Sequence, residues 1–234
     1  QNTSSRISFP DELTSRLEKA DYIVDQTIKK IYDHISKRKD LNKTIFVITS
    51  DHSRGSNNRT STPRAYSFLD STLNIPMLVR VPSLLAKKYP NILKHLKLNT
   101  TKNIANYDII PSLIDILGRD SKRSYEETTS QLIGKSFFSE LDQNRYIICL
   151  SSNEVKSLKV KGFGIIHKNY RFLYSDHSGF QFYNINKDPK QNNNLFLDHF
   201  KSHGAITPYR KIISNNFILK MQMTVNDRKK IMSL

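Results

Sequence analysis

The sequence predicts an α/β core followed by an antiparallel β-sheet. A long amphipathic pattern precedes a segment of almost only β-branched and aromatic residues at 44–49, and short apolar segments alternate with turn residues after position 146. With 234 residues, 37% of them hydrophobic, the chain can form one large domain, or one domain with a small appendix. The sequence contains no run of about 18 apolar residues, so we expect no membrane-spanning segment.

Residues 11–38 predict one long helix. Pro10 comes directly before Asp11 and Glu12, and acidic residues favour the start of a helix. The apolar residues of this segment are three or four positions apart: Leu13, Leu17, Ala20, Val24, Ile28, Ile31 and Ile35. We expect the apolar face of this helix to pack on a sheet.

Residues 44–49 predict a strand that is buried on both faces and is therefore central in a helix-covered sheet. A second strand is predicted at 75–82, where prolines bracket an apolar segment. Helical spacing from 103 to 117 contains Pro111, so we expect this helix to begin near the proline and to end at Gly118 as its C-cap.

The second half of the chain predicts a different architecture. Residues 121–145 are expected to form a surface excursion, because their first part is charged and polar. A strand at 146–150 precedes an antiparallel meander, whose strands are predicted at 159–167, 170–175 and 180–183. A polar turn at 184–194 and a weakly helical tail from Phe196 follow. The expected domains are 1–120, 121–145 and 146–234.

The formal net charge of +16 comes from 37 Lys and Arg against 21 Asp and Glu, and these residues are spread along the chain. This distribution favours a solvated basic surface, with an anionic substrate or an anionic surface as the alternative. The sequence has no dense basic block and no RNA-binding or zinc-finger motif, so nucleic acid is not the partner we expect.

Two features bear on covalent chemistry. Cys149 is the single cysteine, which excludes an intrachain disulfide, and we interpret it as a small buried hydrophobic residue. Four N-x-[ST] sequons occur in a sequence rich in Asn and Ser, so glycosylation and coincidence remain equally open. The sequons begin at Asn2, Asn42, Asn58 and Asn99.

A carboxylate and an imidazole, Asp51 and His52, follow the predicted strand at 44–49. In open α/β sheets, ligands bind outside the carboxyl ends of the strands. Oxygen and nitrogen donors together suit Zn, Mn, Mg or Ca. Taken alone, however, the dipeptide more often represents a loop carboxylate beside an unrelated histidine.

The surrounding segments resemble the sulfatase family of the alkaline-phosphatase superfamily. Residues 42–52, NKTIFVITSDH, are similar to the family segment dNTlvifTSDHG, and Tyr22 and Asp25 lie where the family's preceding helix has Y…D. Further landmarks follow in the family's order: IPMLVRVP at 75–82, IANYDIIPSLIDILG at 104–118, IGKS at 133–136 and FYNINKDPKQNNNL at 182–195.

The resemblance implies an α/β fold with a mixed β-sheet flanked by helices, alkaline-phosphatase-like, and a smaller C-terminal antiparallel sheet. It implies that residues 1–120 are the C-terminal half of the catalytic core and that 146–234 form the C-terminal subdomain. The activity implied is metal-dependent hydrolysis or transfer of sulfate or phosphate esters. Asp51 and His52 would bind the metal, and Arg54 and Arg64, with Arg59 as an alternative, would bind the anionic substrate.

The implied cofactor is a divalent metal, Ca or Mg before Zn or Mn. The implied partners are an anionic sulfate or phosphate ester and either the missing N-terminal half or another protein chain. We expect a location in the secretory pathway, in lysosomes or outside the cell.

The sequence also departs from the family pattern. The family's nucleophile and first metal carboxylates precede the segments matched here, Ser53 replaces a glycine, and Asn74 replaces a basic residue. The chain therefore corresponds to part of an enzyme, and turnover by it alone is not expected. The alternative is a non-catalytic sulfatase-like protein, a pseudoenzyme, that serves as a structural or binding subunit.

Overall fold

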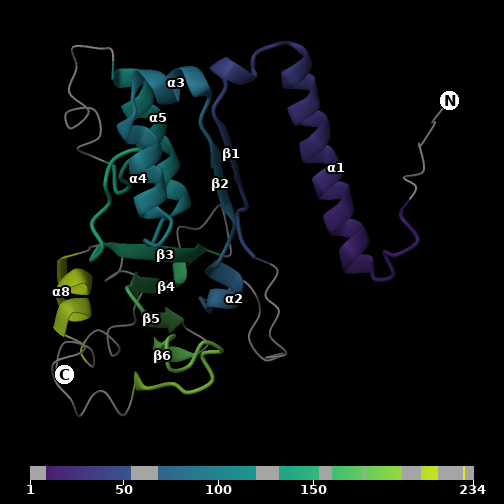
Figure 1. Cartoon of the computed structure of the whole chain (residues 1–234). Coiled ribbons are helices and arrows are strands. Elements are labelled where there is room, and N and C mark those ends of the chain that lie inside the picture. The colour runs from purple at the N-terminus through teal and green to yellow at the C-terminus, as the bar shows by residue number, and fades with distance from the viewer. Residues whose placement is uncertain are drawn as a thin grey trace. The chain divides into compact units, whose positions relative to one another are not determined.

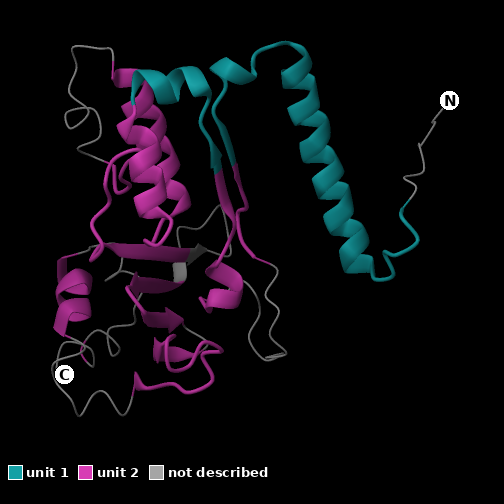
Figure 2. Cartoon of the chain, viewed as in Figure 1, with its two compact units in different colours: residues 1–47, 79–89 teal, residues 48–78, 90–234 magenta. Residues whose placement is uncertain are grey.

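The computed structural model describes residues 9–53, 68–119, 132–152, 160–175, 178–196, 207–215 and 229. The chain divides into two compact units, one of residues 1–47 with 79–89 and one of residues 48–78 with 90–234 (Figure 2). This division differs from the boundary expected near residue 120. Within the described residues, no helix is long and apolar enough to cross a membrane.

Helices precede and follow two β-sheets along the chain, which confirms the predicted α/β class (Figure 1). One sheet has the order β1-β2 and the other the order β3-β4-β5-β6. The elements are α1 (Arg16–Lys37), η1 (Leu41–Lys43), β1 (Phe46–Thr49), α2 (Asp70–Leu73), β2 (Met77–Arg80), α3 (Ser83–Lys88), α4 (Asn91–Asn99), η3 (Asn106–Asp108), α5 (Ile109–Gly118), β3 (Tyr146–Ser152), β4 (Val160–His167), β5 (Tyr170–Ser175), β6 (Gly179–Asn184) and α8 (Thr207–Asn215).

Helix α1 begins at Arg16, not at residue 11, because Ser15 caps it. The Ser15 hydroxyl accepts the Glu18 N–H at 3.1 Å, and the Glu18 carboxylate accepts the Ser15 N–H at 2.8 Å. This reciprocal capping box is a stronger start signal than the acidic pair after Pro10. The Ser15 N–H also lowers the pKa of Glu18 below its ordinary value.

The apolar face of α1 does not pack as predicted. No residue of this helix is buried, and Leu17, Val24 and Ile31 are 56%, 55% and 53% exposed. Tyr32 does contact a strand residue, because its ring lies 5.6 Å from that of Phe46 in β1. The amphipathic pattern therefore predicts the helix correctly, but its packing on a sheet is not observed at these three side chains.

Strand β1 is shorter than predicted and only half-buried along its length. A strand is buried on both faces only where other layers cover both faces of its sheet, and the sheet described here consists of β1 and β2. The prediction that 44–49 is fully buried is therefore wrong for this chain. At the other end of β2, the Arg80 guanidinium donates to the carbonyl oxygens of Leu41 at 2.8 Å and Thr44 at 3.3 Å.

Helix α5 begins at Ile109, close to the predicted start near Pro111. Pro111 is tolerated there because the first N–H groups of a helix have no intrahelical acceptor. Gly118 is the last helical residue and Arg119 is the C-cap with right-handed helical angles, so the prediction of Gly118 as C-cap is wrong. The Arg119 side chain instead returns to Asp115, where its Nε donates at 2.9 Å.

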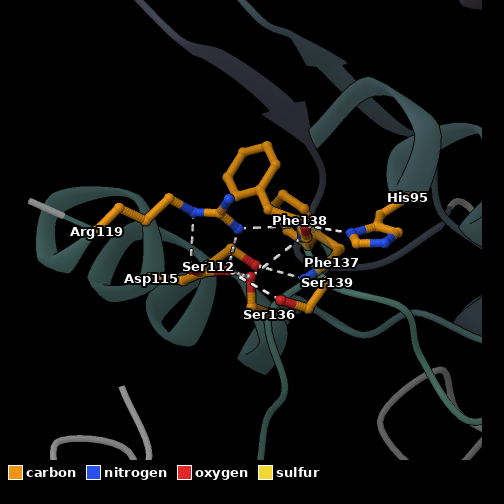
Figure 3. Close-up of polar contacts among 8 residues, drawn as sticks. All are labelled: His95, Ser112, Asp115, Arg119, Ser136, Phe137, Phe138 and Ser139. Carbon is orange, nitrogen blue, oxygen red and sulfur yellow. Dashed lines mark hydrogen bonds and ion pairs between the residues drawn. The ribbon is translucent and has the colours of Figure 1, made fainter. Parts of the chain in front are cut away.

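Residues 132–145 carry buried side chains, although we expected a surface excursion at 121–145. Phe137 and Phe138 are 1% and 0% exposed. The Asp115 carboxylate of α5 accepts hydrogen bonds from the hydroxyls of Ser136 and Ser139, which fixes this segment to the helix (Figure 3). Residues 120–131 lie outside the described residues.

A second buried carboxylate, Asp108, joins three segments at the start of α5. Its side chain is 0% exposed and accepts two hydrogen bonds from the Arg145 guanidinium, at 2.7 and 2.9 Å. It also accepts the N–H groups of Ala105 at 2.9 Å and Lys135 at 2.8 Å. Asp108 therefore connects η3, the segment around residue 135 and the entry to β3.

The predicted antiparallel meander is confirmed, and β3 joins its edge. Strands β3, β4, β5 and β6 pair in sequence order, with Ile148 opposite Ile165 and Phe172 opposite Phe182. Their inner face forms an aromatic core that α8 covers with Tyr209. The ion pair between Arg171 of β5 and Asp70 of α2, at 2.6 Å, connects the sheet to the segment before β2.

The polar turn after β6 is built by side-chain caps. Asp188 accepts the Asn193 N–H at 2.7 Å, and Asn194 accepts the N–H groups of Phe182 at 3.0 Å and Phe196 at 3.0 Å. These bonds return the chain along the edge of the meander, so the residues that resemble the family's D-P-x-x-x-N-N-L turn have structural roles.

We predict that Arg145→Ala lowers the free energy of unfolding by about 3–5 kcal/mol, because it leaves the buried Asp108 carboxylate without its counter-charge. Urea denaturation measures this change. Arg38→Ala is the control, since Arg38 forms an exposed pair with Asp40 at 3.3 Å and exposed pairs contribute about 0–1 kcal/mol. Equal effects of the two substitutions would contradict the role given to Asp108.

We predict that Asp188→Ala lowers the free energy of unfolding by about 1 kcal/mol, since it removes the acceptor of the Asn193 N–H. Asp188→Asn keeps a side-chain oxygen and should lose less. Thermal unfolding of both variants tests the prediction. A defect confined to catalysis or ligand binding, with unchanged stability, would show that this turn is not structural.

Candidate metal centre

The carboxyl end of β1 is attached to the start of α5. The Thr49 hydroxyl donates to the Asn106 side-chain oxygen at 3.0 Å, and the Asn106 amide donates to the Ser50 carbonyl at 2.8 Å. Asn106 belongs to η3, which is continuous with Asp108 and α5. Both ends of this connection lie in the second unit, so the position of residues 49–50 is defined within it.

Asp51 and His52 follow directly and lie side by side on the surface. Their side chains are 86% and 61% exposed, and His52 Nε2 lies 3.8 Å from Asp51 Oδ2. The other carboxylate oxygen, Oδ1, accepts the His52 N–H at 2.9 Å. This hydrogen bond lowers the pKa of Asp51 below its ordinary value.

The second ring nitrogen of His52 lies near a backbone carbonyl. His52 Nδ1 is 2.9 Å from the carbonyl oxygen of Ser53. In the tautomer that carries its proton on Nδ1, this nitrogen donates to Ser53 and Nε2 keeps a free lone pair. Histidine ligands of metals characteristically have this arrangement, in which a carbonyl orients the ring.

The donor set fits two ligands of a divalent cation. Neighbouring ligand atoms of one ion lie about 3–3.4 Å apart at the usual metal–ligand distances, so a small rotation of these exposed side chains brings Nε2 and Oδ2 into range. In the part of the chain that the structure describes, no group of three or more His, Cys, Asp or Glu side chains could hold an ion. Among the described residues, Asp51 and His52 are thus a pair of donors rather than a complete site.

The arginines expected to bind the substrate, Arg54 and Arg64, and the alternative Arg59, lie outside the described residues. The last described residue before them is Ser53, whose N–H donates to the Thr72 carbonyl at 2.9 Å. The structure thus places the two predicted metal ligands together, and leaves the anion-binding role of the arginines as a prediction.

Two cavities in the second unit are lined by residues other than this pair. One of about 390 Å³ is lined by residues of the segment 135–145, and one of about 80 Å³ surrounds the Asp70–Arg171 ion pair and includes Asn74. Neither of these two cavities is lined by Asp51 or His52, which lie on open surface.

The role of Asn106 in holding the end of β1 was not predicted from the sequence. It is 57 positions from Thr49 in the sequence, and an asparagine before a helix has many structural explanations. Its only signal was its place within the segment 104–118 that resembles the sulfatase family.

Cys149 has the environment expected of a structural residue. It packs against the apolar cluster that includes Leu173 and Tyr183, and burial raises the pKa of its thiol to about 11. Because the thiolate is the nucleophilic form, this cysteine is not an activated nucleophile.

The fold is similar to that of sulfatases of known structure. A 4S-sulf protein of Bacteroides thetaiotaomicron, from a locus for the metabolism of multiple glycosaminoglycans, matches with a TM-score of 0.57 and 20% identity over 90% of this chain and 44% of its own. The protein yidJ of Bacteroides fragilis, assigned as a sulfatase, matches with a TM-score of 0.57 and 16% identity over 86% and 42%. A phosphonate monoester hydrolase of Agrobacterium radiobacter matches with a TM-score of 0.54 and 16% identity over 85% and 39%.

The chain spans about two fifths of the length of these structural relatives. The family model described as "Protein of unknown function (DUF229)" matches residues 5–150, which is more than half of the chain. The chain therefore belongs to this family. The search among curated proteins found no match.

We predict that the Cys149 thiol of the native protein stays unmodified by iodoacetamide at pH 8. With a pKa of about 11, only about one thiol in a thousand is ionised at this pH. Mass spectrometry of the native and the urea-unfolded protein measures the modification, and the unfolded protein is the control that should react. Rapid alkylation of the folded protein would contradict a structural role.

Proposed function

We propose that this chain supplies two metal ligands, Asp51 and His52, to the hydrolysis or transfer of sulfate or phosphate esters. The observation that carries the proposal is the position of Nε2 and Oδ2, 3.8 Å apart directly after β1, in a chain with a sulfatase-like fold.

A divalent metal, Ca or Mg before Zn or Mn, would polarise the ester oxygen when bound at this pair. The chain's own residues would position that metal: the Ser53 carbonyl orients the His52 ring, and the His52 N–H orients the Asp51 carboxylate. We further propose that Arg54 and Arg64, which follow this pair in the sequence, bind the equatorial oxygens of the anionic ester. Guanidinium groups suit this role because they donate two parallel hydrogen bonds.

Completion of the site requires further polypeptide, either the remaining part of a sulfatase-like core or another protein chain. The surface of α5 supports this proposal. Ile110, Leu113 and Leu117 on this helix are 55%, 38% and 80% exposed, whereas Ser112 and Asp115 are buried. A helix in a finished core has the opposite arrangement, with its apolar face covered. A large exposed apolar face indicates a protein contact.

The second candidate is a non-catalytic sulfatase-like protein that acts as a structural or binding subunit. The exposed, two-donor arrangement of Asp51 and His52 is the observation that favours it. For either candidate we propose a location in the secretory pathway, in lysosomes or outside the cell. Nucleic acid remains an unsupported partner.

We predict that the complete protein binds Mn²⁺ or Ca²⁺ and that Asp51→Asn weakens this binding by at least about 100-fold, because the substitution removes a charged ligand. Hydrolysis of an aryl sulfate or a phosphonate ester should be lost in parallel. Isothermal titration calorimetry measures the binding, and circular dichroism should show unchanged secondary structure.

Asp33→Asn is the matched control, because Asp33 is also a surface aspartate beside a basic group, Lys29 at 2.6 Å. This variant should retain both metal affinity and turnover. If the folded complete protein binds no divalent metal, the non-catalytic candidate is supported. If Asp51→Asn leaves metal binding and turnover unchanged, Asp51 does not belong to the site.

A further inference from the structure

Two of the four sequons lie in the described residues, and they have opposite environments. Asn99 is the last residue of α4 and is 0% exposed, whereas Asn42 lies in the short turn η1 before β1 and is exposed. The sequons at Asn2 and Asn58 lie outside the described residues. Of these two sequons, only the one at Asn42 has an asparagine side chain that is accessible to solvent.

The Asn99 side chain is buried and makes three hydrogen bonds within the protein. Its amide donates to the carbonyl oxygens of Phe137 at 3.1 Å and Ser139 at 2.8 Å, and its side-chain oxygen accepts the Leu141 N–H at 3.1 Å. A glycan on this nitrogen would break at least one of these bonds and would have no path to solvent. A folded molecule therefore carries an unmodified Asn99.

The Asn42 side chain is open to solvent. Within the described residues it makes one long hydrogen bond, in which its oxygen accepts the Ser83 hydroxyl at 3.4 Å. Nothing in this environment requires both protons of the side-chain amide. Exposure on a turn is the placement that a bulky, hydrated glycan needs.

The backbone on both sides of Asn42 is fixed. The Arg80 guanidinium donates to the carbonyl oxygens of Leu41 and Thr44, and the Thr44 hydroxyl donates to the Asp40 carbonyl at 2.8 Å. All these residues belong to the first unit. The turn is thus held by contacts that do not involve the Asn42 side chain, so a modification there leaves them intact.

We propose that Asn42 is an attachment site for an N-linked glycan and that Asn99 is not. In the reaction, Asn42 Nδ2 forms a bond to the anomeric carbon of the first N-acetylglucosamine of a lipid-linked oligosaccharide. The bond between that carbon and the lipid diphosphate breaks, and the amide loses one proton as the lipid diphosphate leaves. No atom changes its oxidation state. This inference rests on the proposed location in the secretory pathway, but not on the proposed metal site, because Asn42 makes no contact with Asp51 or His52 among the described residues.

The test is site-specific mass spectrometry of the protein purified from its source organism. Peptide N-glycosidase in ¹⁸O-water converts each glycosylated asparagine to an ¹⁸O-labelled aspartate. We expect the label at residue 42 and none at residue 99. An unlabelled Asn42, whether or not another sequon carries a glycan, would overturn the proposal, and so would a label at Asn99 in the folded protein.

Two variants in the complete protein, secreted from a eukaryotic host, complete the experiment. Asn42→Gln should lose one glycan, seen as a single-step gain in electrophoretic mobility, and should keep its melting temperature in the deglycosylated state. Lys43→Ala is the matched control, because it changes the middle residue and preserves the sequon. Unchanged mobility of Asn42→Gln, or loss of the same glycan in Lys43→Ala, would contradict the assignment.

Discussion

The buried Asp108 carboxylate is the interaction on which the proposed site depends. It accepts hydrogen bonds from Arg145 and from the backbone at Ala105 and Lys135, and it thereby fixes η3 at the start of α5. Asn106, two positions earlier, then binds Thr49 and Ser50 at the end of β1. The location of Asp51 and His52 therefore follows from a charge that is fully removed from solvent.

The same region supports the proposal that further polypeptide covers this chain. Helix α5 directs Ser112 and Asp115 inward, where they bond to the segment 136–139 (Figure 3), and it exposes Ile110, Leu113 and Leu117. Polar groups on the inner side can be satisfied by local bonds, but the apolar side has no such compensation in water. The exposed apolar residues of α1 present the same imbalance in the first unit.

Local sequence patterns predicted the helices and strands well, but they predicted the burial of these elements less well. Strand β5 lies where alternation and flanking turns place it, and the meander follows from repeated turn signals. The start of α1 was misplaced because the Ser15–Glu18 capping box is closer to the apolar repeat than Pro10 is. The burial of β1 could not be derived from its own residues, since burial depends on which strands and helices cover it.

For the candidate site, the sequence indicated Asp51 and His52, but it did not indicate the residues Asn106 and Asp108 that hold them in position. Asp51 and His52 follow from an apolar strand that ends in two donors and from the resemblance of the surrounding segments to sulfatases. The bonds of Asn106 and Asp108 join residues dozens of positions apart, and no short-range pattern contains that information. The likeness in fold to sulfatases agrees with the family resemblance, while the chemistry rests on the geometry of the pair.

The most direct measurement is anomalous X-ray diffraction from crystals of the complete protein soaked in Mn²⁺. The account predicts an anomalous peak within about 2.3 Å of both Asp51 Oδ2 and His52 Nε2, with the remaining ligands contributed by polypeptide beyond the described residues. Manganese peaks located only elsewhere, or no peak beside an ordered Asp51 and His52, would contradict it.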